Sequence, residues 1–326
     1  MQVTIEVIDW PLWQAFTIAR ETFTSIACIQ VTLTDAQGRQ GRGEAVGVDY
    51  AGETTATMAA QIEAVRAQLD DTLSCASLQT LLPAGGARNA LDCALWDLNA
   101  KRSGVPAWQA AGLASFAPRP TSFTFGMMDE PLLRAVARKY AHFPLLKVKT
   151  DRHRGLDPAR IVHAEAPNAR LILDANTSWG ADELRRFAPE FEQLSIALLE
   201  QPVDPHEDEL LRGLRLPVPV AADEAFNDRG SIPALAGKYQ VLNIKLDKTG
   251  GLTEALASAR AGLEQGYRLM VGCMVGSSLS MAPGVVVAQL CDYVDLDGPL
   301  LQSRDVAHPI EYLNGTVGTP TPELWG

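Results

Sequence analysis

The chain has 326 residues, of which 47% are hydrophobic and 21% are charged. This apolar fraction is enough to build a large core, which excludes an intrinsically disordered chain. Lys and Arg number 28 against 39 Asp and Glu, so the formal net charge of −11 argues against a nucleic acid or an anionic membrane surface as a partner.

The first residues and the cysteines predict a cytoplasmic protein. Residues 1–10 (MQVTIEVIDW) contain two acidic side chains and neither the basic nor the apolar region of a signal peptide. The sequence has no run of eighteen apolar residues, so no segment is expected to span a bilayer. The five cysteines are scattered and form no C-x-x-C pair, which favours reduced thiols over disulfides or zinc.

The first third of the chain predicts a small α+β unit. Residues 3–8 and 27–34 are rich in β-forming residues, and a turn leads into a third short strand that ends at 41–45 (GRGEA). Helical patterns follow at 55–69 and 88–101, where leucines recur on one face. Strands followed by helices are typical of an α+β arrangement.

From residue 121 onward, short apolar strands alternate with helical segments. The strands are continuous apolar runs, as expected for parallel strands covered on both faces. The predicted strands are 121–125, 145–149, 170–175, 196–201, 218–224, 241–247, 268–273 and 292–297. Eight such strands predict a closed barrel, and because no convincing helix follows the last strand we expect a (β/α)7β form. An open doubly wound sheet is the alternative, but no Gly-rich phosphate loop follows an early strand.

A Gly/Pro/Ala-rich stretch at 112–120 marks a boundary between the two halves. We therefore expect an α+β capping domain at 1–115 and a modified (β/α)7β TIM-type barrel with the catalytic groups at 116–300. The tail at 301–326 is expected to pack back on the capping domain. The fold class is α/β.

Charged side chains recur at the carboxyl ends of the predicted barrel strands, where the reactive groups of such barrels lie. From Lys149 to Lys245 they follow one another at intervals of 22 to 26 residues, about the length of one βα unit. One charge at a strand end is usually an ordinary loop residue, but five consecutive strands that end this way predict a shared site. The residues are Lys147, Lys149, Asp174, Glu200, Asp223, Lys245, Asp295 and Asp297.

Three of these carboxylates, Asp174, Glu200 and Asp223, follow neighbouring strands. Carboxylates that face one point repel each other unless a cation neutralises them. Ligation by oxygen alone suits a hard ion, Mg²⁺ first and Mn²⁺ second, whereas the absence of His and Cys from the set disfavours zinc. Asn176 and Glu224 are candidate supporting partners.

The lysines predict acid–base chemistry. Lys147 and Lys149 are two residues apart on a strand, so both side chains point to the same face. Burial and a like-charged neighbour lower the pKa of a lysine, which is how a lysine becomes a base near neutral pH. Lys147 could instead pair with the carboxylates, which leaves Lys149 and Lys245, on opposite sides of the barrel, as the acid–base pair.

These segments together resemble the enolase superfamily, specifically its muconate-lactonizing subgroup, over essentially the whole chain. The resemblance rests on GRGEA, ALDCALWDLNAK, LKVK, LDAN, LEQP, ADE and NIKLDKTGG. It implies a barrel with a capping domain, Mg²⁺ held by the three carboxylates, and lysine bases. It leaves the reaction open, because racemases, epimerases, cycloisomerases and syn-dehydrating synthases share these motifs.

Two further features resemble dipeptide epimerases. Asp295-Leu296-Asp297 is similar to the D-x-D motif whose acids hold the ammonium group of the substrate, although an ordinary D-x-D-G turn would look the same. Arg20, in FTIARET, resembles the arginine that pairs with the distal carboxylate in L-Ala-D/L-Glu epimerases. An isolated surface arginine is the alternative for Arg20.

The resemblance therefore implies a Mg²⁺-dependent dipeptide epimerase. Lys149 and Lys245 would exchange the α-proton, Lys147 would bind the substrate carboxylate, and loops near 12–25 and 46–56 would close the site. A muconate-type cycloisomerase or o-succinylbenzoate synthase is the first alternative, and a catalytically silent barrel that acts as a binding protein is the second. The preferred dipeptide stays open, as does the oligomeric state, although family members often form symmetric homo-oligomers.

Overall fold

The computed structural model describes residues 1–18 and 21–326, which form three sheets. An antiparallel capping sheet contains β1 (Gln2–Thr17), β2 (Thr22–Thr34) and β3 (Gln40–Ala45). Four helices accompany it: α1 (Thr55–Val65), α2 (Cys75–Leu81), α3 (Gly86–Ser103) and α4 (Ala107–Ala110). A small antiparallel sheet near the end of the chain pairs β4 (Arg119–Pro120), β13 (Tyr312–Leu313) and β14 (Thr316–Val317).

The largest sheet is the barrel, in which eight parallel strands follow one another in chain order. Its strands are β5 (Ser122–Phe125), β6 (Leu145–Lys149), β7 (Arg170–Asp174), β8 (Ile196–Glu200), β9 (Val220–Ala222), β10 (Val241–Ile244), β11 (Arg268–Val271) and β12 (Tyr293–Val294). Its helices are α5 (Glu130–Tyr140), α6 (Asp157–Glu165), α7 (Ala181–Phe187), α8 (Ile232–Leu235), α9 (Leu246–Thr249), α10 (Leu252–Glu264), α11 (Ser278–Ala288) and α12 (Gly298–Leu301). The predicted fold class is confirmed.

The barrel departs from regularity in its connections. Only a short 3-10 helix at Asp208–Leu211 joins β8 to β9, and α8 between β9 and β10 has four residues. The last strand is followed by the four residues of α12, in agreement with the predicted (β/α)7β form. The predicted closure is carried by side chains at the seam between β5 and β12: Thr121 Oγ1 accepts a hydrogen bond from Leu296 N at 3.0 Å.

Inside the barrel, apolar side chains form a floor below the charged residues. Ile172, Leu198 and Ala221 belong to one buried cluster in the barrel interior. Two residues after each of these comes a carboxylate, namely Asp174, Glu200 and Asp223 in turn. Side chains two residues apart on a strand point to the same face, so these acids also face the barrel interior. The alternation along each strand therefore places a ring of charge at the barrel mouth, above an apolar plug.

In the capping sheet, two glycines allow α3 to lie directly on β3. A Cβ at Gly41 would approach Ala94 O to 2.2 Å, and a Cβ at Gly43 would approach Ala90 O to 2.2 Å. Any larger residue would therefore push the helix off the strand. The close packing of α3 on β3 therefore explains why the GRGEA segment has glycines at these two positions.

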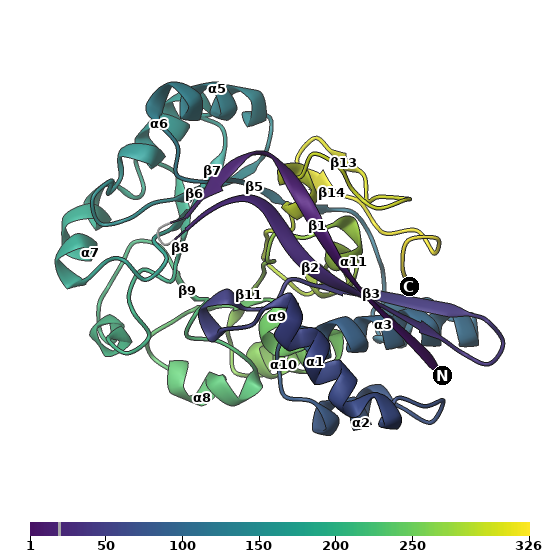
Figure 1. Cartoon of the computed structure of the whole chain (residues 1–326). Helices are drawn as coiled ribbons and strands as arrows, with labels where there is room; N and C mark the ends of the chain where they lie inside the picture. Colours follow the sequence, from purple (N-terminus) through teal and green to yellow (C-terminus); the bar gives the residue numbers. More distant parts are fainter. Residues whose placement is uncertain (19–20) are drawn as a thin grey trace.

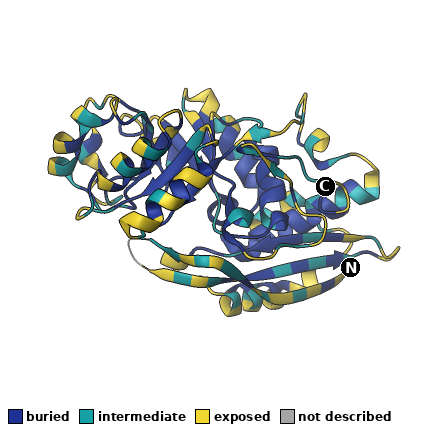
Figure 2. Ribbon diagram, turned by 90° about the horizontal axis from the view of Figure 1, so that it is seen from above, coloured by how far each residue is buried: buried dark blue, intermediate teal, exposed yellow. Residues whose placement is uncertain are grey.

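The β1–β2 hairpin is much longer than the predicted strands. Its arms remain paired at Thr17 and Thr22, beyond an irregularity between Pro11 and Phe16. The hairpin extends across the barrel opening, and the residues of its outer strand are mostly exposed or partly exposed (Figure 1, Figure 2). The capping sheet therefore supplies one wall above the ring of charge.

The end of the chain packs on α3. Trp325 Nε1 donates to Cys93 O at 2.9 Å, and Gly326 N donates to Asp97 Oδ1 at 2.8 Å. The domain limits at residues 115 and 300 stay predictions. Within residues 1–18 and 21–326, none of the helices is both long and apolar enough to cross a membrane.

Candidate active site

A cavity of about 170 Å³ lies between the hairpin and the barrel mouth. Its capping side is mainly apolar but also contains the acids Asp49 and Glu53. Its barrel side is charged. The apolar residues are Phe16, Ile18, Phe23, Ile26, Val46, Met274, Val275 and Leu301, and the charged barrel residues are Lys147, Lys149, Asp223, Glu224, Lys245, Asp295 and Asp297. A ligand in this cavity would meet most of the charged groups on the barrel side.

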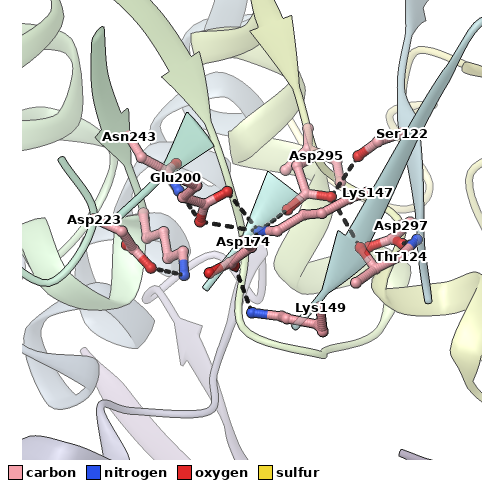
Figure 3. Close-up of polar contacts among 12 residues, drawn as sticks. Ser122, Thr124, Lys147, Lys149, Asp174, Glu200, Asp223, Asn243, Asp295 and Asp297 are labelled. Carbon is pink, nitrogen blue, oxygen red and sulfur yellow. Dashed lines mark hydrogen bonds and ion pairs between the residues drawn. The ribbon is translucent and has the colours of Figure 1, made fainter. Parts of the chain in front are cut away.

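Lys147, from β6, lies at the centre of the charged ring (Figure 3). Its Nζ is 2.8 Å from a Glu200 oxygen, 2.9 Å from Asp295 Oδ2 and 3.1 Å from Asp174 Oδ2. Burial alone would lower the pKa of this lysine, but the carboxylates outweigh it and hold the pKa of Lys147 well above its usual value. Lys147 is therefore a fixed cation among the acids.

Lys149 and Lys245 face the cavity from β6 and from the end of β10. Lys149 Nζ donates to Asp174 Oδ2 at 2.6 Å and to Asn176 Oδ1 at 3.0 Å. Lys245 Nζ donates to Asp223 Oδ2 at 2.7 Å. Each of the two lysines is thus held by a different carboxylate, and Figure 3 shows the pair Lys149–Asp174.

The expectation that burial and a like-charged neighbour depress the pKa of the lysines on β6 is wrong for Lys147, and Lys245 shows the same balance of effects. Burial does lower the pKa of Lys245, but the carboxylate of Asp223 overrides that effect and raises the pKa above its usual value. The sequence reasoning counted the neighbouring lysine and omitted the acids that approach from other strands. The carboxylates decide the sign of the pKa shift, because their oxygens lie 2.7 to 3.1 Å from the two ammonium groups.

Asp174, Glu200 and Asp223 end adjacent strands and are almost fully buried. Their oxygens are donors of the type that a hard cation prefers. Glu200 Oε2 is buried and lies 2.8 Å from Lys147 Nζ, but no described residue donates a well-aligned hydrogen bond to it, so this oxygen can also face a cation. The carboxylates are kept apart by ammonium groups, and in the described part of the chain no three His, Cys, Asp or Glu side chains converge into a closed ligand set.

The two acids of the D-x-D motif have different partners. Asp295 Oδ1 accepts hydrogen bonds from Ser122 Oγ at 2.5 Å and Thr124 Oγ1 at 3.2 Å, and its Oδ2 binds Lys147. Asp297 Oδ2 accepts a hydrogen bond from Thr124 N at 2.5 Å. Burial, and then the neighbouring Asp295, raise the pKa of Asp297 above its usual value. Asp295 is therefore engaged within the protein, while Asp297 borders the cavity with fewer partners.

Arg20, the predicted partner of a glutamyl side chain, lies outside the described residues. The structure therefore places eight of the predicted site residues together at the barrel mouth and describes nothing of this one. Their catalytic, binding and metal roles stay predictions.

Sequence reasoning missed three buried residues that support the acids. Lys248 Nζ donates to Asp223 Oδ1 at 2.6 Å, Gln201 Oε1 accepts from Asp223 N at 2.9 Å, and Asn243 Nδ2 donates to Glu200 Oε1 at 2.9 Å. The alternation of side chains along the strand could have identified Asn243, because it lies two residues before Lys245 and therefore points to the same face. No local signal identifies Lys248, which sits on α9 and reaches back toward β9.

Comparison with known proteins gives matches over nearly the whole chain. The profile for enolase C-terminal domain-like proteins matches residues 131–323, and the profile for the mandelate racemase / muconate lactonizing enzyme N-terminal domain matches residues 1–112. The L-Ala-D/L-Glu epimerase of Escherichia coli (strain K12) is 38% identical over 316 residues, covering 96% of this chain and 98% of that protein.

Two solved structures share the fold. An enolase family member from Agrobacterium tumefaciens with homology to dipeptide epimerases, which contains bound sodium and L-Ala-L-Glu, has a TM-score of 0.96 and 38% identity and covers 99% of both chains. A dipeptide epimerase from Methylococcus capsulatus, complexed with Mg and L-Arg-D-Lys, has a TM-score of 0.87 and 30% identity and covers 98% of this chain and 96% of that one.

Proposed function

Because the chain belongs to the mandelate racemase / muconate lactonizing enzyme family of the enolase superfamily, we propose that it inverts the α-carbon of the C-terminal residue of a dipeptide. It is an isomerase of the dipeptide epimerase type, in line with its relatives. The observation that carries the proposal is the pair Lys149 and Lys245, which enter one cavity from two strands and are held by separate carboxylates.

The proposed cofactor is Mg²⁺, with Mn²⁺ as the substitute, held by Asp174, Glu200 and Asp223. The cation would stabilise the negative charge that develops on the substrate carboxylate when the α-proton leaves. Lys147 would assist by binding the same carboxylate, because its ammonium group already lies among these acids.

Two lysines allow inversion because each serves one face of the α-carbon. One of Lys149 and Lys245 removes the proton, and the other delivers a proton to the opposite face. The wall formed by Phe16, Phe23 and Ile26 excludes water from the reacting carbon. Proton exchange with solvent then passes through the lysines.

We propose that Asp297, rather than both acids of the D-x-D motif, carries most of the binding of the substrate ammonium group. Asp295 already accepts from two hydroxyl groups and Lys147, so its role is to hold that lysine. An acid on this side disfavours the cycloisomerase and o-succinylbenzoate synthase alternatives, whose substrates have no ammonium group. The retained lysines and acids disfavour a catalytically silent barrel, because buried charges without a use cost stability.

The finer parts of the proposal concern substrate and setting. A preference for L-Ala-D/L-Glu depends on Arg20, and the cationic side chain would pair with the glutamyl carboxylate. We place the enzyme in the cytoplasm, where its five free cysteines remain reduced. The homo-oligomer implied by the family resemblance stays part of the proposal.

The test is isotope exchange. Protein, Mg²⁺ and L-Ala-L-Glu are incubated in D₂O with a panel of other dipeptides, and mass spectrometry with chiral chromatography follows α-deuterium and inversion. We expect deuterium only at the C-terminal residue, and much slower exchange for N-acetyl-L-Ala-L-Glu. The absence of exchange on every dipeptide would overturn the proposed function.

A further inference from the structure

Glu44, at the end of β3, is a buried carboxylate outside the charged ring, with 1% of its surface exposed. It accepts hydrogen bonds from Trp10 Nε1 at 3.2 Å and Gln30 Nε2 at 2.7 Å, which belong to the other two strands of the capping sheet. It also accepts from Ser277 N and Ser277 Oγ, both at 2.7 Å, across the interface with the barrel. All four partners are donors, so the site suits a carboxylate and opposes an amide.

The barrel partner of Glu44 begins a helix. Ser277 is the N-cap of α11, and its Oγ accepts from Leu279 N at 3.1 Å. The N-terminus of a helix carries partial positive charge, so a carboxylate there is favourable. Glu44 thus fixes the position at which the loop after β11 turns into α11.

That loop, residues 272–277, forms the part of the cavity wall that contains Cys273, Met274 and Val275. It also packs against the residue after Asp297: a Cβ at Gly298 would lie 2.7 Å from Gly276 O. A shift of the loop would therefore displace the backbone that carries Asp297.

We propose that Glu44 is a positioning residue that transmits the placement of the capping sheet to the ammonium-binding side of the cavity. The proposed path of contacts runs from Glu44 to Ser277 and then through Gly276 to the backbone of Gly298. Neither Lys149 nor Lys245 is on this path, so substrate binding should depend on Glu44 more than proton transfer does. The inference rests on the proposed function for its kinetic part only.

The test is Glu44→Gln, which keeps the size of the side chain and replaces an acceptor by a donor that faces other donors. We expect KM for L-Ala-L-Glu to rise about tenfold and kcat to change less than about threefold. Hydrogen exchange of the backbone amides of 272–277 should quicken about tenfold, because the loop opens more often. The exchange readout needs no turnover, so a wild type without epimerase activity would overturn the proposed function and leave this measurement valid.

Asp97→Asn is the matched control. Asp97 is a fully buried carboxylate that accepts from Arg42 N and Gly326 N, both at 2.8 Å, and does not line the cavity. It should lower Tm and leave both KM and exchange in 272–277 unchanged. If Glu44→Gln fails to fold, the test uses Ser277→Ala, which removes the hydroxyl donor and keeps the backbone donor. This variant should also raise KM and quicken exchange in 272–277, by smaller factors. Unchanged KM and exchange in the folded variant, or equal changes in the control, would overturn the inference.

Discussion

Two regions of the molecule bury charge in opposite ways. At the barrel mouth, acids pair with ammonium groups, as in Lys149–Asp174 and Lys245–Asp223. At the interface between the capping sheet and the barrel, acids accept from backbone and hydroxyl donors. Asp247 there accepts from Gly47 N at 2.9 Å and from Val46 N at 3.1 Å.

The difference separates exchangeable charges, which can leave one partner for another, from fixed charges, which cannot. A lysine side chain has several rotatable bonds and can transfer its ammonium group from a carboxylate to a substrate. A backbone N–H cannot move without moving its chain, so an acid bound to it fixes geometry. Two pKa values illustrate the two kinds of partner: burial raises the pKa of Asp247 to about 6, whereas Lys245 and Lys248 outweigh burial and hold the pKa of Asp223 below its usual value.

The largest effect should come from removing an exchangeable charge at the mouth. Lys149→Ala and Lys245→Ala should each lower epimerisation by about a thousandfold or more, because one face of the α-carbon loses its acid or base. Each variant should keep its fold by circular dichroism. Proton NMR in D₂O should still detect α-proton exchange for the one enantiomer that the surviving lysine faces. Full epimerisation by either variant would contradict the two-base proposal.

The next effect concerns the metal acids. Asp174→Asn, Glu200→Gln and Asp223→Asn should each weaken Mg²⁺ binding on the order of a hundredfold, since a neutral amide is a poorer ligand for a hard cation. Isothermal titration calorimetry measures this affinity directly. Asp208→Asn, which breaks a buried pair with Lys238, is the control and should bind Mg²⁺ normally. EDTA should abolish activity and added Mg²⁺ should restore it. Full activity of metal-free protein would refute the assignment.

The two acids of the D-x-D motif, which lie side by side at the barrel mouth, should affect different kinetic constants. Asp297→Asn should raise KM for L-Ala-L-Glu about thirtyfold, because the substrate ammonium group loses its charged partner. Asp295→Asn should lower kcat more than it raises KM, because Lys147 loses one of its three acids. Steady-state kinetics on both variants distinguishes these effects. Identical KM and kcat changes would show that the two acids act as one unit.

The smallest effect on turnover is expected from the interface acid Asp92, which is fully buried and accepts from Thr253 N at 2.9 Å. Burial raises its pKa to about 6. Between about pH 4 and 6 the folded chain therefore binds a proton that the unfolded chain releases, so the free energy of unfolding falls as pH rises.

Asp92→Asn should remove that pH dependence and leave turnover near the wild-type value. Urea denaturation at pH 4.5 and 7.5 is the measurement. The wild type should lose about 2 kcal/mol relative to the variant as pH rises from 4.5 to 7.5. Parallel unfolding curves at both pH values would place the folded-state pKa of Asp92 near its ordinary value.

The sequence by itself determined the features that depend on local spacing. Continuous apolar runs, repeated once per βα unit, predicted the strands of the barrel, and the residue at each strand end predicted the ring of charge. These inferences hold because side-chain direction in a strand alternates with a period of two and because parallel strands end at the same side. The GRGEA and NIKLDKTGG segments indicated the family, and the profiles of that family match the chain.

Only the tertiary structure decided which charges meet. Lys147 and Asp295 are 148 positions apart, and Glu44 and Ser277 are 233 apart, so no local pattern joins them. The sign of the lysine pKa shifts was missed for the same reason, since it depends on acids that other strands bring within 3 Å. A charge acquires its role from its neighbours in space, and Coulomb energy depends on that distance rather than on separation along the chain.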